Sequence, residues 1–78
     1  MTKYHSEVDA IGLKCPMPIL HCKRGLNLLK TNQVLKIQTT DKNAKKDFEA
    51  FCLNTGHLLI KSEVIKKITT FYIKKLAI

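Results

Sequence analysis

Hydrophobic and polar positions alternate along two segments of the chain. In residues 4–10 the even-numbered positions share one face, with Val8 and Ala10 on it, and the odd-numbered positions are polar. In residues 33–39 Leu35 and Ile37 share one face, and Val34, Lys36 and Gln38 share the other. A period of two is typical of a half-buried strand, so we expect a strand in each segment. Gly12 should end the first one.

Two other segments show helical spacing. Residues 16–29 carry one apolar stripe, which Leu20 and Leu28 do not join, and residues 43–54 carry a second with Cys52 at its margin. Thr40 or Asp41 should cap the second helix, and Gly56 should end it. The two stripes consist of Ile19, Cys22, Leu26 and Leu29, and of Ala44, Phe48, Phe51 and Thr55.

Residues 58–65 and 68–76 are rich in β-branched and aromatic side chains, with only Lys66 and Lys67 between them. They should pair as an antiparallel hairpin, although the turn lacks the usual Gly or Asn. The order β-α-β-α-β-β and a right-handed crossover predict a two-layer α/β (α+β) sandwich. It would have a four-stranded mixed sheet with two helices on one face, in a single domain of residues 1–78.

Composition and charge limit the cellular compartment and the partners expected for this domain. The 78 residues carry 14 basic and 6 acidic side chains, for a net charge of +8, but the lysines are dispersed along the chain. That charge could attract nucleic acid or an acidic protein, or could simply keep the protein in solution. No apolar run is long enough to span a bilayer, and no signal-peptide core follows Met1. Three cysteines make a complete disulfide framework improbable, so we expect a cytoplasmic protein without a membrane association.

Cys15 carries the strongest chemical signal, in the run GLKCPMP that begins at Gly12. Pro16 and Pro18 are typical of the first turn of a helix. A thiol there faces free N–H groups and the positive end of the helix dipole, and Lys14 adds a positive charge. These features lower the pKa of a cysteine and favour its thiolate, which is the nucleophile.

Other roles for Cys15 find less support. No histidine is adjacent to it, and only the fold could bring His5, His21 or His57 close. Cys22 lies too far along the helix for a disulfide, and we expect it and Cys52 to be buried, although Cys52 could approach Cys15 in space. Cysteine pairs or histidine pairs with metal-ligand spacing are absent, so we expect no metal and no cofactor.

Residues 8–18, VDAIGLKCPMP, closely resemble the signature of the TusA (SirA-like) sulfur-carrier family. Residues 40–52 match its second conserved region, and the Gly56-His57 pair and final hairpin continue the resemblance. It implies a carrier, of sulfurtransferase type rather than a stand-alone enzyme, in which Cys15 accepts sulfane sulfur from a cysteine desulfurase as a persulfide. The sulfur would pass to a relay protein, towards tRNA processing by thiolation of wobble uridine to 2-thiouridine. Carriers for sulfur oxidation or cofactor assembly are the alternatives within the family.

Two residues depart from the family pattern: Met17 stands where Glu is frequent, and Lys42 where Pro is frequent. Both bear on partner choice rather than on the nucleophile. We expect a partner-docking surface formed by Lys14, Leu20, Lys23 and Asp41. An equal alternative is that Leu20 packs at the edge of the helix and that Asp41 is only a helix cap. The free protein should be a monomer with only an indirect link to tRNA.

Two readings from other functional classes compete with the carrier. A nucleic-acid-binding module would suit the positive charge, but the chain has only five aromatic residues and no RNA-binding aromatic motif. A thiol redox protein would need Cys52 as the resolving partner of Cys15.

Overall fold

The computed structural model describes residues 3–14 and 16–76, which form the six expected elements in the expected order. Each begins or ends within two residues of its predicted bounds. The differences of two residues are at the start of the first strand, which begins at Ser6 rather than Tyr4, and at the ends of the first helix and the last strand, which end at Asn27 and Lys74 rather than at residues 29 and 76. The elements are β1 (Ser6–Ala10), α1 (Met17–Asn27), β2 (Val34–Thr39), α2 (Ala44–Thr55), β3 (Leu58–Ile65) and β4 (Ile68–Lys74).

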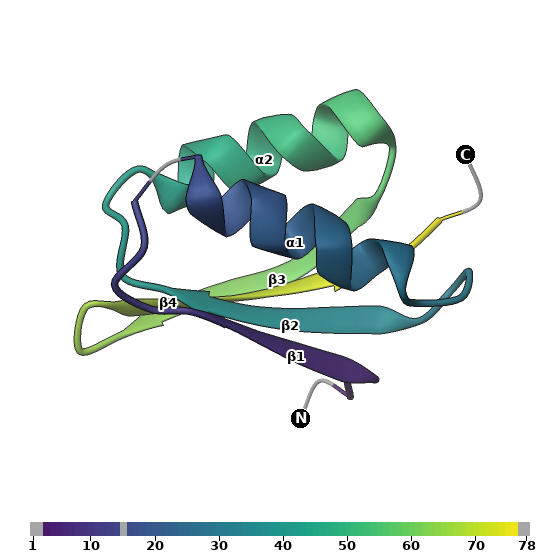
Figure 1. Cartoon of the computed structure of the whole chain (residues 1–78), viewed down its shortest axis with the longest axis horizontal. Coiled ribbons are helices and arrows are strands. Elements are labelled where there is room, and N and C mark those ends of the chain that lie inside the picture. Colours follow the sequence, from purple (N-terminus) through teal and green to yellow (C-terminus); the bar gives the residue numbers. More distant parts are fainter. Residues whose placement is uncertain (1–2, 15, 77–78) are drawn as a thin grey trace.

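The strands form one mixed sheet in the order β1-β2-β4-β3. β1 and β2 are parallel, with Val8 opposite Ile37, as the crossover through α1 requires. β4 lies between β2 and β3 and is antiparallel to both, which confirms the hairpin. Both helices cover the same face of this sheet (Figure 1). The fold is therefore the two-layer sandwich that the sequence predicts.

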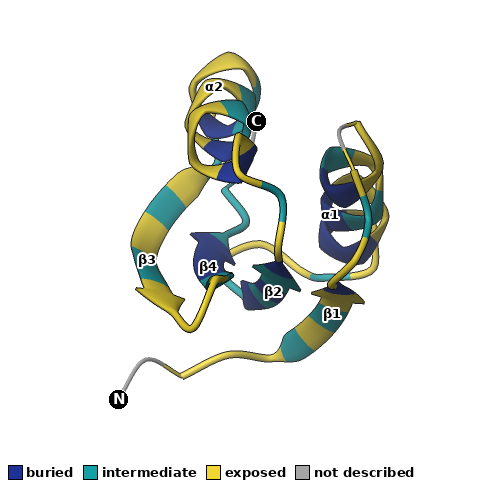
Figure 2. Ribbon diagram, turned by 90° about the vertical axis from the view of Figure 1, so that its left-hand side faces the viewer, coloured by how far each residue is buried: buried dark blue, intermediate teal, exposed yellow. Residues whose placement is uncertain are grey.

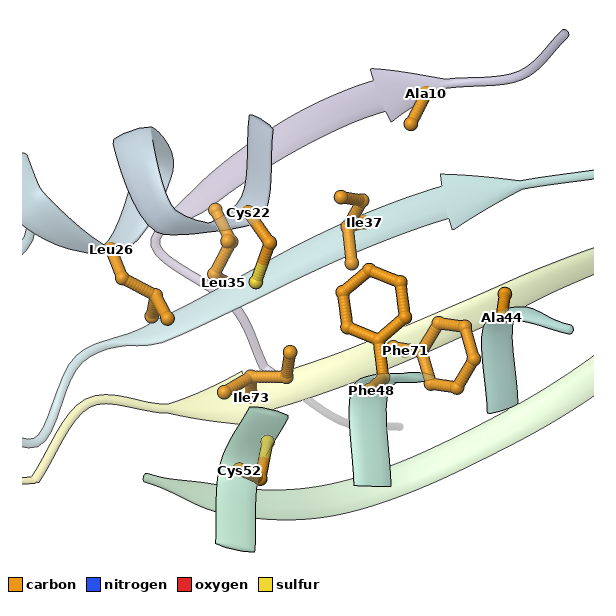
Figure 3. Packing of buried hydrophobic residues seen from close by; sticks show 10 residues of the cluster. All are labelled: Ala10, Cys22, Leu26, Leu35, Ile37, Ala44, Phe48, Cys52, Phe71 and Ile73. Carbon is orange, nitrogen blue, oxygen red and sulfur yellow. The ribbon is translucent and has the colours of Figure 1, made fainter. Parts of the chain in front are cut away.

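The core lies between the helices and the sheet. The buried positions of the helices lie on their inner sides (Figure 2), and the side chains of both layers meet in one cluster (Figure 3). Phe48 of α2 stacks on Phe71 of β4 with ring centroids 4.4 Å apart. Leu35 and Ile37 are fully buried beneath the helices, which confirms the inward face of β2.

The buried faces of the helices include residues that the predicted apolar stripes left out. In α1, Pro18 and Gly25 are buried together with the expected Cys22 and Leu26. Gly25 lets the helix approach the sheet, because a Cβ there would lie 3.0 Å from side-chain atoms of Leu35 and Val8. In α2, Cys52 is a central buried position rather than a marginal one.

Two glycines act as predicted. Gly56 has a φ of 86° and ends α2, with its N–H donating to the Cys52 carbonyl at 2.8 Å. Gly12 has a φ of 84° in the turn after β1. Both need the left-handed conformation that glycine adopts without steric penalty. None of the helices in residues 3–14 and 16–76 is long and apolar enough to cross a membrane.

Candidate functional site

The site expected from the sequence lies where β1 leads into α1, around Cys15. Cys15 itself is outside the described residues, so the site is built from its neighbours in the chain. The turn before it is well defined: the Leu13 N–H donates to the Ala10 carbonyl at 3.2 Å, and the Ile11 N–H donates to Asp9 Oδ1 at 2.9 Å. Gly12 occupies the position of this turn that requires a positive φ.

The start of α1 has fewer free backbone N–H donors than the sequence indicates. Pro16 is the N-cap residue and Pro18 lies within the first turn, and neither has an N–H. The Met17 N–H already donates to the Lys14 carbonyl at 2.9 Å, and the Leu20 N–H to the Pro16 carbonyl at 3.1 Å. The positive end of the helix dipole remains, and no acidic residue in the first turn opposes it.

The loop between β2 and α2 closes the site from the other side. Thr40 Oγ1 accepts a hydrogen bond of 2.9 Å from the Gly12 N–H, across 28 positions of sequence. Thr40 therefore does not cap α2, and that prediction is wrong. Asp41 is not the cap either: Asn43 is, without a side-chain bond, and Asp41 Oδ1 accepts from the Asn43 N–H at 3.3 Å in a turn just before the helix. The hydroxyl of Thr40 is instead a tie between two loops.

The two loops enclose an open hollow of about 490 Å³. It brings together Lys14 and Asp41, two of the four expected docking residues. Asp41 Oδ2 is buried and has no hydrogen-bond partner among the described residues. The remaining lining residues are Gly12, Leu13, Thr40, Lys42 and Asn43.

The other two expected docking residues lie elsewhere on α1. Leu20 is 45% exposed, so nearly half of its surface is accessible on α1. Lys23 lines a second hollow, of about 280 Å³, between α1 and α2. The four residues are thus not gathered in one cavity, and any surface that includes all of them must extend along α1. Phe51 and His57 contribute the far wall of this second hollow.

The buried cysteines behave as small apolar residues. Cys22 is fully buried and Cys52 is 6% exposed, and both are free thiols. Burial raises the pKa of the Cys52 thiol to about 11. Burial, with the neighbouring Cys52 as a smaller cause, raises that of Cys22 further. A thiol so protonated is a poor nucleophile, which is evidence against the thiol redox reading.

Two of the three histidines, His5 and His57, are occupied in structural contacts. His57 Nδ1 accepts from the Leu76 N–H at 3.2 Å, and desolvation together with Lys75 lowers the pKa of His57. His5 Nδ1 accepts from the Val34 N–H at 3.0 Å. Among the described residues, no group of three or more His, Cys, Asp or Glu side chains is arranged to hold a metal ion.

The open face of the sheet offers little to a nucleic acid. Tyr4 and Tyr72 meet there with ring centroids 6.3 Å apart, but Tyr72 is only 8% exposed. Lys36 is paired with Glu7 at 3.2 Å, and a second pair, Lys61–Glu63, lies at 3.6 Å. Of these two rings only Tyr4 is substantially exposed, at 46%, and Lys36 lies over it at 5.0 Å from the ring centroid. Recognition of single-stranded RNA by a sheet uses two or three exposed rings on which bases stack.

Sequence reasoning missed the hydrogen bond of Thr40 to the first loop. It predicted the hairpin turn at Lys66 and Lys67 but did not place that turn beside the site. Figure 1 places this turn at the same end of the molecule as the two loops of the site. A topological signal existed for the turn, because β4 must run antiparallel to β2 and therefore begins at that end. No local signal marks the Thr40 bond.

Known proteins resemble the chain along nearly its whole length. The family model described as Sulfurtransferase TusA matches residues 6–75. The sulfur carrier protein TusA of Allochromatium vinosum is 43% identical over 96% of this chain and 99% of its own. A putative sulfur carrier protein of Bacillus subtilis is 41% identical over 87% of this chain and 91% of its own. A SirA-like protein of Desulfitobacterium hafniense, known from its crystal structure, has a TM-score of 0.74 at 18% identity, covering 94% of this chain and 100% of its own.

Proposed function

Because the chain belongs to the TusA sulfurtransferase family, we propose that it is a sulfur carrier in which the Cys15 thiolate is the sulfur-bearing group. In the proposed step the thiolate attacks the outer sulfur of a persulfide on a donor protein. A new S–S bond forms on Cys15, the donor's S–S bond breaks, and the donor cysteine leaves as a thiolate. One sulfur and its proton change hands, so the step needs no oxidant or reductant.

The observation that carries the proposal is the helix start that follows Cys15 directly in the chain. Pro16 at the N-cap and a first turn without acidic residues give a positive helix end, and exposed Lys14 precedes the cysteine. Both favour a thiolate. The open hollow beside Lys14 suits contact with another protein better than enclosure of a small substrate.

The donor is proposed to be a cysteine desulfurase. The acceptor is proposed to be a relay protein on the route to 2-thiouridine in tRNA, with sulfur oxidation and cofactor assembly as the alternative routes. We treat residues 1–78 as one carrier domain in the cytoplasm that binds its partners one at a time.

Mass spectrometry of the intact protein tests the carrier function. Incubation with a cysteine desulfurase and free cysteine should add one sulfur, about 32 Da, to Cys15. Cys15→Ser should remain unmodified, and omission of free cysteine should give the same result. Sulfur that still adds to Cys15→Ser would disprove the assignment, because Cys22 and Cys52 would then be the acceptors.

Docking along α1 has its own test. Lys23→Glu reverses an exposed charge and should slow sulfur loading while the melting temperature stays unchanged. Lys30→Glu is the matched control, because Lys30 is also exposed but follows the far end of α1. Equal loading rates for the two variants would remove Lys23 from the docking surface.

A further inference from the structure

The hairpin turn between β3 and β4 has an unusual combination of conformation and sequence. Lys66 and Lys67 both have positive φ angles, 49° and 69°. Two consecutive residues of this kind define a type I′ turn, for which Asn-Gly is the favoured pair. A β-carbon is strained in this region, so two lysines make the turn less stable than it could be. Residues kept in strained backbone are a reason to look for a function.

The turn borders the proposed site. Lys67 and Val64 of the hairpin line a hollow of about 410 Å³ together with Thr40, Asp41 and Lys42. Those last three residues also line the hollow beside Lys14, so the two hollows adjoin. A partner that contacts the loops near Cys15 would therefore also reach the hairpin.

This end of the molecule is cationic, and its charges are available. Lys36 and Lys61, on the open face of the sheet, have glutamate partners. The lysines of this end have none among the described residues. The carboxylates nearest to them in the chain are those of Asp9, Asp41, Asp47 and Glu63, and Glu63 is paired with Lys61. The exposed lysines here are Lys14, Lys42, Lys45, Lys46, Lys66 and Lys67.

Apolar side chains accompany these cations. Val64 is 67% exposed and Ile65 is 61% exposed, both at the end of β3 next to the turn. The residues that line the two hollows, all from the described part of the chain, include no aromatic side chain. Aliphatic groups beside lysines complement an acidic protein segment that carries an apolar side chain, whereas single-stranded RNA needs rings for stacking.

We propose that Lys42, Lys66 and Lys67, with Val64, form a docking rim for an acidic segment of a protein partner. The existence of this rim does not depend on the proposed function. Only the identity of the partner does: it would be the protein that exchanges sulfur with Cys15. Its lysines attract the partner's carboxylates, and Val64 packs against an aliphatic side chain of the same segment.

Replacement of the turn separates docking from folding, because the two should change in opposite directions. Lys66→Asn combined with Lys67→Gly installs the favoured turn pair and should raise the melting temperature. The same variant should bind a fluorescein-labelled, glutamate-rich peptide with two leucines about tenfold more weakly at about 0.02 M ionic strength, measured by anisotropy. The matched control is Lys3→Asn with Lys30→Asn, which removes the same charge from exposed positions elsewhere and should change binding less than about twofold.

Three results would overturn the proposal. Equal weakening in the control pair would show that only net charge matters. A single-stranded RNA of the same length that binds more tightly, with the same loss in the turn variant, would show that the partner class is wrong. If the turn variant were no more stable than the unaltered protein, the two lysines would not strain the turn, and the reason to look for a function there would be lost. Cys15→Ser should bind the peptide normally, so a failure of sulfur loading does not affect this outcome.

Discussion

Gly25→Ala tests how closely α1 is seated on the sheet that positions the site. Two effects oppose each other at this buried helical position. Alanine favours a helix over glycine by about 1 kcal/mol. Its Cβ, however, would lie 3.0 Å from Leu35 Cδ1, 3.0 Å from Val8 Cγ2 and 3.1 Å from Leu35 Cδ2. Each of these separations is well below the roughly 3.5–4.0 Å optimum for two carbon atoms.

The packing conflict should prevail over the gain in helix propensity. Leu35 is fully buried, and the β-branched Val8 has little rotamer freedom, so neither can retreat easily. Overpacking of this kind costs about 1–3 kcal/mol. The net effect is a loss of about 1 kcal/mol, or about 5 °C in melting temperature for a domain of this size.

A double-mutant cycle measured by urea unfolding checks this reasoning. Leu35→Val removes both Cδ atoms that crowd the new methyl group. The combination of Gly25→Ala and Leu35→Val should therefore lose less stability than the sum of the single variants. Stabilisation by Gly25→Ala alone, or strict additivity in the cycle, would refute the argument that α1 needs a glycine here.

Three other results should follow from the structure. Thr40→Val removes the acceptor of the Gly12 N–H and should cost about 0.5–1 kcal/mol; it should also slow sulfur loading of the proposed carrier, whereas Thr40→Ser should restore it. The pKa of His57 is lowered in the folded protein, so the unfolded chain takes up its proton first as the pH falls. The free energy of unfolding should then decrease below about pH 6.5, and His57→Gln should remove that part of the pH dependence in urea titrations. Cys22 and Cys52 should react with iodoacetamide only as fast as the protein unfolds, because both are buried with raised thiol pKa values. Rapid triple alkylation of the native protein, counted by mass, would contradict this.

Local patterns sufficed for the elements and for the inward face of β2, but not for Tyr4, which was expected on the face of Val8 and Ala10 and instead meets Tyr72 and Lys36 on the open face of the sheet. The period of two placed Leu35 and Ile37 in the core, and a single glycine marked the end of α2, because these signals arise from near neighbours in the chain. Gly25 was missed because a glycine adds nothing to an apolar stripe. Its burial reflects how closely a helix meets the sheet, which is a property of the tertiary structure.

The site was less predictable for the same reason. Thr40 is a residue type that often caps helices. Only the fold shows that its hydroxyl instead accepts a hydrogen bond from the Gly12 N–H, which belongs to a loop distant in sequence. The turn at Lys66 and Lys67 has a sequence that disfavours its own conformation, so pairing of the flanking strands must impose it. In both cases contacts between segments distant in sequence determine the local conformation, against the preference of the local sequence. Both Thr40 and the lysine turn lie at the proposed site.

The strand order explains how the three segments of the proposed site come to lie at one end of the molecule. β1 and β2 are parallel, so the loops that leave them meet at one edge of the sheet. β4 is antiparallel to β2, which brings the turn before β4 to the same edge. The Cys15 motif lies in the first of these three segments, whereas the docking rim proposed here lies in the second and third. If the proposed rim is correct, substitutions at Lys66 or Lys67 should change which partner binds while the run from Gly12 to Pro18 stays unaltered.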